Sequence, residues 1–128
     1  MARFLAPLRT AAPGGFLLRN QRTGQVVAAE VLPALDSAAR RRGLLGRDSL
    51  AGGTAMVIAP TNAVHTFFMR FPIDVAFVGK DGRVVKIRAG LRAWRMAGAW
   101  GAHAVVEMAA GSFARDRKST RLNSSHRT

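Results

Sequence analysis

The sequence predicts a mainly β domain of the α+β class, a small antiparallel open barrel or sandwich of about six or seven strands with one short helix. Short apolar runs rich in Val, Ile and Phe alternate with turns that contain Gly or Pro, which is typical of strands. One stretch, residues 37–42, carries helix start and stop signals. The 128 residues suit a single domain, and 48% hydrophobic with 21% charged residues is an ordinary globular composition.

The first elements are expected to be a hairpin and the helix. Apolar residues 16–19 and 25–31 flank the turn-like Arg22-Thr23-Gly24, a pattern that favours two paired strands. Asp36 can accept hydrogen bonds as the N-cap of a helix over residues 37–42. Gly43 follows, where a helix needs a residue that tolerates positive φ to end. The exposed face of this helix would carry Arg40-Arg41-Arg42.

Strands are expected to fill the second half of the chain. Residues 55–59, 64–69 and 73–78 are apolar runs, and Pro60 and Pro72 interrupt them. Residues 79–82 have the composition of a hairpin turn. Residues 102–108 form a last apolar run, which Gly111 closes.

Residues 83–88 alternate in polarity and indicate how the sheet is built. Val85 and Ile87 would share one face, with Val84, Lys86 and Arg88 on the other. A strand with one polar face is half-buried, which an antiparallel sheet or a small barrel provides.

The domain is expected to span residues 16–115, between a disordered basic N-terminal segment at 1–15 and a disordered tail at 116–128. More than half of the net charge of +13 lies in residues 1–22, with Arg3, Arg9, Arg19 and Arg22, and in residues 116–128, with Arg117, Lys118, Arg121 and Arg127 against Asp116. Pro7 and Arg9 interrupt any signal-peptide core, so a cytoplasmic location is expected, with a misassigned start codon as the alternative. No apolar run approaches the roughly 20 residues of a transmembrane helix.

Several linked motifs resemble one prokaryotic family. They are Arg42-Gly43-Leu44-Leu45-Gly46-Arg47, Met56, residues 65–70, Pro72-Ile73-Asp74, Asp81-Gly82-Arg83-Val84-Val85 and residues 106–111. In order and spacing they resemble the domain of unknown function 192 family over about residues 24–114. Leu45, Phe68 and Arg70-Phe71 depart from the family's usual Met, Trp and Lys-Asn. The resemblance implies a compact β-rich domain and implies no activity.

The resemblance also marks structural motif positions and a doubtful end. Expected structural positions are Gly43, Gly46, Pro72, Asp81, Gly82, Glu107 and Gly111. Residues 118–126 resemble a translated sequencing adapter, so residues 116–128 are interpreted as an artefact that replaces the true C-terminus. A missing last strand would expose a sheet edge.

Asp74 is the most informative candidate residue, because it is a carboxylate inside an apolar run. A buried unpaired carboxylate is costly, so it would need a partner, for which Arg42, Arg47 and His65 are available. The alternatives are that Asp74 faces the polar side of the sheet or that it fixes the loop after the helix through Arg47. Glu107 lies in a similar apolar context, and the two acids could pair if their side chains converged.

The aromatic run 67–71 offers a second set of candidates. With period 2, Phe67 and Met69 share one face and are expected in the core, whereas Phe68 on the other face is the better ligand contact. Trp94 and Trp100 could cap the open end of a barrel or line a groove. An aromatic platform for bases or sugars is the alternative interpretation of this run.

The sequence predicts a noncatalytic binding or accessory module for a small polar or carbohydrate-like ligand. The candidate ligand-binding residues are Arg47, His65, Phe68, Asp74 and Trp94. No catalytic residues, metal site or cofactor are predicted, because the chain has no cysteine, no metal-ligand spacing and no P-loop or nucleophile motif. One alternative is a hydrolase-like enzyme that uses Asp74 or Glu107 with His65.

The other alternative is weak, nonspecific nucleic-acid binding through the basic surface of Arg40–Arg42 and the Lys86/Arg88 face.

Overall fold

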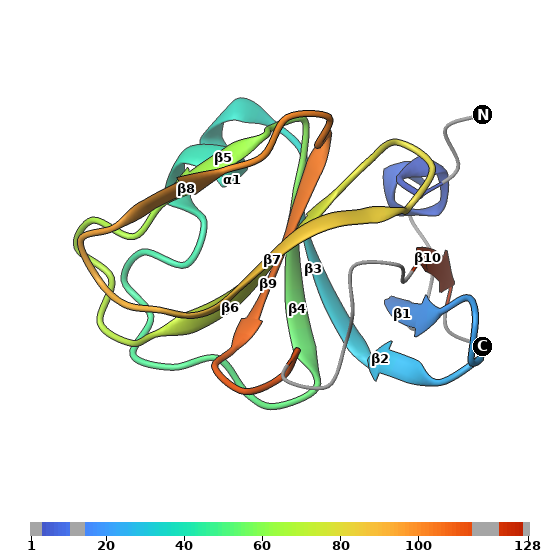
Figure 1. Cartoon of the computed structure of the whole chain (residues 1–128), viewed down its shortest axis with the longest axis horizontal. Coiled ribbons are helices and arrows are strands. Elements are labelled where there is room, and N and C mark those ends of the chain that lie inside the picture. The colour runs from blue at the N-terminus through green and yellow to red at the C-terminus, as the bar shows by residue number, and fades with distance from the viewer. Residues whose placement is uncertain (1–3, 11–14, 114–120, 127–128) are drawn as a thin grey trace.

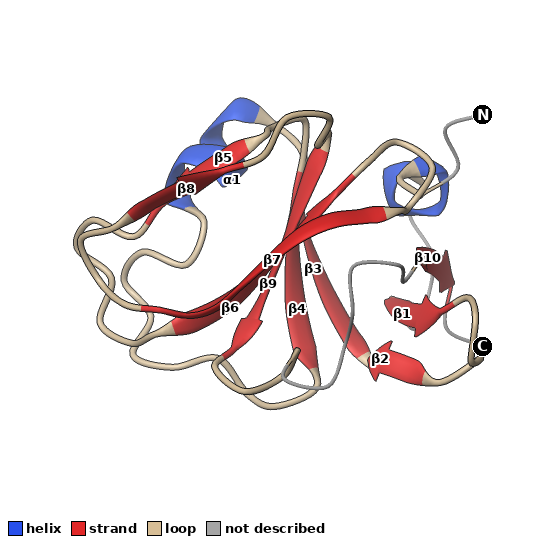
Figure 2. Cartoon of the chain, viewed as in Figure 1, coloured by secondary structure: helices blue, strands red, loops and turns tan. Residues whose placement is uncertain are grey.

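The structure is a computed structural model that describes residues 4–10, 15–113 and 121–126. Within these ranges it contains ten strands, one α-helix and one 3₁₀-helix (Figures 1 and 2). The helices are η1 (Ala6–Arg9) and α1 (Ser37–Arg42). The strands are β1 (Phe16–Asn20), β2 (Val26–Ala28), β3 (Glu30–Ala34), β4 (Thr54–Ile58), β5 (Ala63–His65), β6 (Ile73–Val78), β7 (Val84–Leu91), β8 (Met96–Gly98), β9 (Ala104–Ala109) and β10 (Leu122–His126). The predicted mainly β class is confirmed.

A five-stranded sheet in the order β3-β4-β9-β6-β7 forms the centre of the molecule. Its strands pair antiparallel except β3 and β4, which run parallel. The prediction of a wholly antiparallel sheet is therefore wrong at this edge. Parallel neighbours need a long crossover, and the connection from β3 to β4, which contains α1, supplies it.

The sheets stay open, and more strands form than the six or seven predicted. The apolar run 25–31 divides at Ala29, so that β2 pairs with β1 while β3 joins the central sheet. Two smaller sheets result, β10-β1-β2 and β5-β8. In Figure 1 they lie on opposite sides of the central sheet, with α1 beside β5-β8 and η1 beside β1 and β10.

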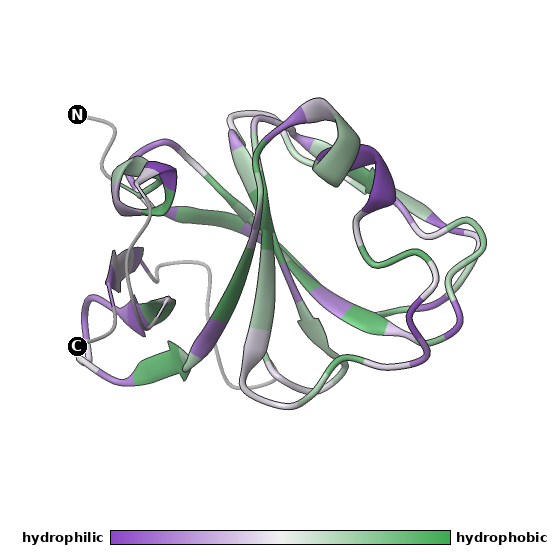
Figure 3. Cartoon of the chain, turned by 180° about the vertical axis from the view of Figure 1, so that it is seen from behind, coloured by the Kyte–Doolittle hydropathy of each residue, from purple (hydrophilic) through white to green (hydrophobic). Residues whose placement is uncertain are grey.

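Each face of the central sheet contributes to its own hydrophobic cluster. Alternating residues of β4, β6 and β9 face opposite ways, as the pleat requires. Val57, Val78 and Val106 join the cluster beneath the β10-β1-β2 sheet. Ile58, Phe77 and Val105 join the cluster beneath α1 and the β5-β8 pair. Figure 3 shows these central strands as the hydrophobic part of the ribbon, while α1 ends in a hydrophilic stretch.

The prediction that Val85 and Ile87 share one face of β7 is wrong. Val84 and Ile87 contact the same cluster, whereas Val85 contacts the opposite one. The pairing of β6 with β7 shifts register between Phe77 and Val78. A β-bulge of this kind reverses the facing of the residues beyond it.

The strand predicted for residues 64–69 ends early, at His65. Thr66 begins a turn in which the amide of Met69 donates to the carbonyl oxygen of Thr66 at 3.1 Å. Phe68 takes a φ of 65°, which no strand residue adopts. The face assignment that assumed an extended strand therefore fails for Phe67, which is half-buried and outside both hydrophobic clusters, although Met69 is buried and Phe68 is exposed as expected.

Described parts of both flanking segments are ordered, contrary to the predicted disorder. Phe4, Leu5 and Leu8 are buried in the cluster on the β1 side of the central sheet. In the predicted tail, residues 122–126 form β10, which pairs antiparallel with β1 and buries Leu122. Apolar side chains in each segment supply the contacts that order it. The rest of the predicted segments, residues 1–3, 11–14, 116–120 and 127–128, lies outside the described residues.

Two local predictions are confirmed in detail. The Asp36 side chain accepts a hydrogen bond from the Ala39 amide at 2.8 Å, as an N-cap does. Gly43 ends α1 with a φ of 47°, which favours glycine. No helix in the described ranges is long and apolar enough to cross a membrane.

Candidate functional site

A pocket of about 150 Å³ opens between α1 and the central sheet. Its walls come from α1 and the turn after it, from the end of β4, and from β5. The residues that give it chemical character are Arg40, Arg41, Arg42, His65 and Glu107. A cavity of this volume suits a small molecule about the size of benzene.

Glu107 is the acidic residue of this pocket. It lies in the middle of β9 and pairs with Met56 of β4 on one side and with Val75 of β6 on the other. The pleat turns its side chain towards α1, the same side as Val105. Only 5% of the residue is exposed.

The carboxyl group of Glu107 makes no hydrogen bond or ion pair with any residue that the structure describes. Burial alone raises the pKa of Glu107 to about 7. At neutral pH the carboxyl group is therefore divided between a form that donates and a form that only accepts hydrogen bonds.

The arginines enter the pocket from the last turn of α1. Arg40 donates from its guanidinium to the Leu35 carbonyl oxygen at 3.1 Å, which ties it to the start of the helix. Arg41 and Arg42 are exposed. Cations at a helix C-terminus interact favourably with the helix dipole, so the last turn of α1 is a favourable place for the three arginines of the pocket.

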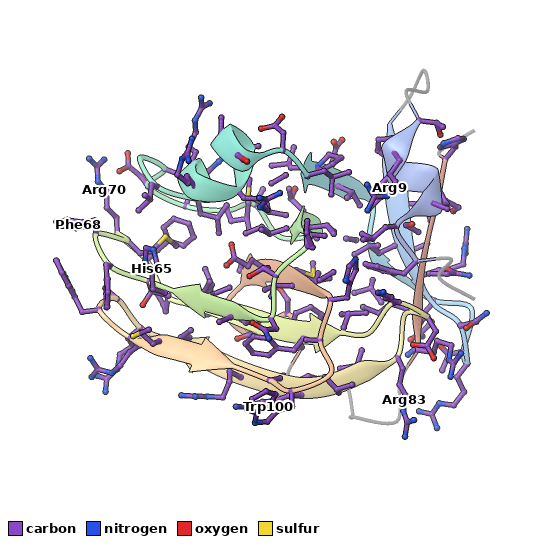
Figure 4. The ribbon with its side chains drawn as sticks, turned by 90° about the horizontal axis from the view of Figure 1, so that it is seen from above. Arg9, His65, Phe68, Arg70, Arg83 and Trp100 are labelled. Atoms are coloured by element: carbon purple, nitrogen blue, oxygen red, sulfur yellow. The ribbon has the colours of Figure 1, made fainter. Side chains whose placement is uncertain are left out.

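His65 lies at the end of β5 and contributes to the same pocket. Its ring stacks on Phe67 with centroids 4.9 Å apart. Figure 4 places His65 near Phe68 and Arg70, at the end of the molecule away from Arg9 and Arg83. The described hydrogen bonds include none between His65 and Glu107.

Asp74, the principal candidate of the sequence analysis, lies elsewhere. It is fully buried, and its two carboxylate oxygens accept hydrogen bonds from the backbone amides of Gly90 and Phe113, each at 2.8 Å. Gly90 has a φ of 63° and lies where the pairing of β6 with β7 shifts register. The predicted partners Arg42, Arg47 and His65 are wrong, because backbone amides freed by a β-bulge and a turn take their place.

The remaining predicted ligand contacts fall into two places. Arg47 lines a separate cavity beside Met56 and Leu45. Phe68 and Trp94 contact each other with ring centroids 4.6 Å apart, and Phe67 stacks on Trp94 at 5.7 Å. The structure therefore brings His65, Phe68 and Trp94 together in one row of rings and leaves Arg47 and Asp74 outside it.

Thr66 holds this row of rings together, and the sequence analysis did not single it out. It is buried, and its hydroxyl donates to the Arg92 carbonyl oxygen at 2.6 Å and accepts from the Arg95 amide at 2.9 Å. The Trp94 amide donates to the Thr66 carbonyl oxygen at 3.0 Å. A threonine between His65 and Phe67 carries no pattern that predicts contacts so far along the chain.

The basic surface predicted as a nucleic-acid contact is only partly free. The Lys86 ammonium donates to the Gly98 carbonyl oxygen at 2.8 Å and lies 5.8 Å from the centre of the Phe77 ring. Arg88 is exposed. Among the described residues, no group of three or more His, Cys, Asp or Glu side chains could hold a metal ion.

Apart from Glu107, which lies within β9, the structural motif positions lie at turns and element boundaries. The Asp81 side chain accepts from the Arg83 amide at 3.0 Å within the turn between β6 and β7. This hydrogen bond, reinforced by Arg121 at 3.3 Å, holds the pKa of Asp81 below its usual range. Pro72 is exposed immediately before β6, and Gly46, Gly82 and Gly111 all have positive φ.

The fold and the pocket define a small mainly β domain that presents one buried carboxyl group to a cavity with arginines in its walls. The chain belongs to the domain of unknown function 192 family, described as "Uncharacterized ACR", whose profile matches residues 18–119. The family resemblance is thus confirmed. No curated protein matches the chain at a significant level.

Two solved structures share the fold. A protein of unknown function from Novosphingobium aromaticivorans is 24% identical with a TM-score of 0.72, covering 84% of this chain and 82% of its own. A proposed transcription regulator from Sinorhizobium meliloti is 20% identical with a TM-score of 0.72, covering 85% of this chain and 91% of its own. At these identities the likeness establishes the fold alone.

Proposed function

We propose that the protein is a noncatalytic binding module that takes a small polar ligand, with hydroxyl or amine groups, into the pocket above Glu107. The observation that carries this proposal is the carboxyl group of Glu107, a residue only 5% exposed, which has no partner among the described residues and borders a cavity. A carboxyl group is costly to bury unless it has a hydrogen-bond partner. A ligand that donates hydrogen bonds to Glu107 supplies that partner.

The charges of the pocket narrow the ligand further. A cationic or hydroxyl group would bind at the Glu107 carboxyl, and an anionic or electron-rich group would bind at Arg41 or Arg42. Small amino acids, hydroxy acids and sugar acids have this combination, and a monosaccharide has the hydroxyl part of it. The volume of about 150 Å³ limits the buried part of the ligand to a few heavy atoms. A cytoplasmic location belongs to the same proposal.

A thermal-shift screen with amino acids, hydroxy acids, sugar acids and monosaccharides tests the proposal. At least one of these classes should raise the melting temperature of the wild type, and Glu107→Gln should weaken the effect about tenfold or more in ligand concentration. Asp81→Asn is the matched control, because Asp81 is an acid in an exposed turn away from the pocket. If no class stabilises the wild type, or if Glu107→Gln responds equally, the proposal is wrong.

The hydrolase-like alternative is reduced to Glu107 and His65, because Asp74 faces the other side of the sheet. The pKa of about 7 places Glu107 in the range of a general acid or base. Ester and glycoside chromogenic substrates, assayed alongside the binding screen, separate the two functions. Turnover that Glu107→Gln abolishes would favour the enzyme, whereas binding without turnover supports the module.

A further inference from the structure

The end of the molecule furthest from η1 carries an exposed apolar tip, formed by Phe68, Trp94 and Met96. Phe68 is 70% exposed, Trp94 55% and Met96 69%. Figure 4 shows Phe68 at the outer edge of the structure, next to Arg70. Large apolar side chains that gather at one surface point mark an interaction site more often than single exposed ones do.

The backbone at the tip is strained at the two residues that carry the exposed rings. Phe68 and Trp94 each have a φ of 65°, and they are the two non-glycine residues with positive φ in the described chain. Bulky residues at positive φ are genuine outliers and carry a conformational cost. Both aromatic rings of the tip are therefore kept at positions where Asn or Gly would fit with less strain.

The tip is also rigidly built. Thr66 connects the two turns that carry the rings, through the hydrogen bonds of its hydroxyl and of its backbone with residues 92–95. Phe67 packs beneath, stacked between His65 and Trp94. The rings are thus presented in a fixed arrangement before any partner arrives, which reduces the entropy lost on binding.

Positive charge surrounds the tip. Residues 63–70 and 91–98, which form the two turns at the tip and the short strands beside them, contain Arg70, Arg92 and Arg95 and no acidic residue. All three arginines are exposed, and Arg70 is paired with Asp48 at 2.7 Å. An apolar tip within a basic surface matches a partner that combines an anionic surface with an apolar interior.

We propose that Phe68, Trp94 and Met96 insert shallowly into the surface of an anionic lipid bilayer, while Arg92 and Arg95 contact the lipid phosphates. Trp and Phe favour the interface between headgroups and acyl chains, and each basic residue near an anionic surface adds attraction. Binding at a membrane interface becomes stronger with the apolar area inserted and with electrostatic attraction to anionic lipids, and the tip supplies both.

Single-stranded nucleic acid is the other polyanion that aromatic and basic residues bind, and the geometry fits it less well. Bases need free ring faces, but Trp94 is covered by Phe67 on one side and contacted by Phe68 at an angle of 59°. Met96 offers no face for stacking. The rings form a packed wedge at the end of the molecule, which suits insertion between lipids.

Fluorescence of Trp94 distinguishes these partners, because the chain has two tryptophans and Trp100→Phe leaves Trp94 alone. With vesicles that contain phosphatidylglycerol, the emission of Trp94 should shift to the blue and be quenched by lipids brominated near the headgroup. Vesicles of phosphatidylcholine alone should give a much smaller response. Quenching by a single-stranded oligonucleotide with no response to anionic vesicles would overturn the proposal in favour of nucleic acid.

Co-sedimentation with the same vesicles tests the individual side chains. Phe68→Asn and Trp94→Asn should each lower the vesicle partition coefficient about tenfold, because each removes an inserted ring. Both variants should keep or raise the melting temperature, since Asn tolerates positive φ. Trp100→Ala is the control: Trp100 is 94% exposed and outside the tip, so binding should not change. Equal loss with Trp100→Ala, or a large fall in the melting temperature of both Asn variants, would overturn the proposal.

Discussion

Asp74 and Glu107 lie on adjacent strands of the central sheet, yet their carboxyl groups face opposite sides of it. Asp74 of β6 is paired with Met108 of β9, and Glu107 of β9 is paired with Val75 of β6, so the two acids are offset by one residue along the strands. Because successive residues of a strand alternate between faces, this offset separates the two acids by the thickness of the sheet. They cannot act as an acid/base pair, and each has its own consequence for stability and binding.

For Asp74, we predict that Asp74→Asn destabilises the fold without changing the pocket. The carboxylate accepts two backbone hydrogen bonds, and an Asn amide can accept only one of them while its NH₂ group faces the other donor. A buried amide left without an acceptor costs about 1–3 kcal/mol. Urea denaturation should show that loss in the free energy of unfolding.

The control for Asp74 is ligand binding by the fraction that remains folded. A compound that stabilises the wild type should stabilise Asp74→Asn by the same increment, because Asp74 is on the far side of the sheet from the pocket. Unchanged stability in the variant would contradict the assignment of Asp74 to the two backbone amides.

For Thr66, we predict that Thr66→Val loosens the turn at residues 92–95, whereas Thr66→Ser does not. Valine keeps the shape but removes the hydroxyl, which leaves the Arg95 amide and the Arg92 carbonyl oxygen without this partner. Amide hydrogen exchange at Arg95 should accelerate at least about tenfold in the valine variant, which corresponds to about 1.4 kcal/mol. Equal protection in the two variants would show that the hydroxyl is not what holds the turn.

For α1, we predict that Asp36→Ala costs about 1 kcal/mol and weakens binding of the anionic part of the ligand. Asp36 is the N-cap of a helix of only six residues, so loss of the cap should fray the turn that carries Arg41 and Arg42. Asp36→Ser restores a capping oxygen and is the control. If Asp36→Ala binds the ligand as tightly as Asp36→Ser does, the position of the arginines does not depend on this cap.

Local signals in the sequence were sufficient for α1 and for the first hairpin. Asp36 and Gly43 determine where α1 begins and ends through contacts within a few residues, and such contacts can be read from adjacent positions. The same holds for the turn at residues 79–82. These features depend on backbone conformations that a few residue types strongly prefer.

Long-range backbone contacts explain most of what the sequence could not reveal. The partners of Asp74 are amides at positions 90 and 113, and any residue except proline offers an amide. Glu107 was recognised as an acid in an apolar strand, but nothing local showed that α1 would leave a cavity above it. The turn at Thr66 replaced an expected strand because its hydrogen bonds go to residues 92 and 95, beyond the range of any local pattern.

Glu107 should make the stability of the protein depend on pH in a direction unusual for a carboxyl group. Its pKa rises from 4.5 to about 7 on folding, so between these values the folded protein holds a proton that the unfolded chain has released. The free energy of unfolding therefore falls as pH rises from about 4.5 to 7, by on the order of 3 kcal/mol in total. Above pH 7 the full cost of the buried charge is present.

Glu107→Gln mimics the protonated form, so it should match the wild type near pH 4 and exceed its stability at pH 8. Urea denaturation of both proteins across this range measures the difference, in which the contributions of other titrating groups such as His103 cancel. A difference that does not change with pH would show that Glu107 reaches solvent or an undetected partner in the folded state.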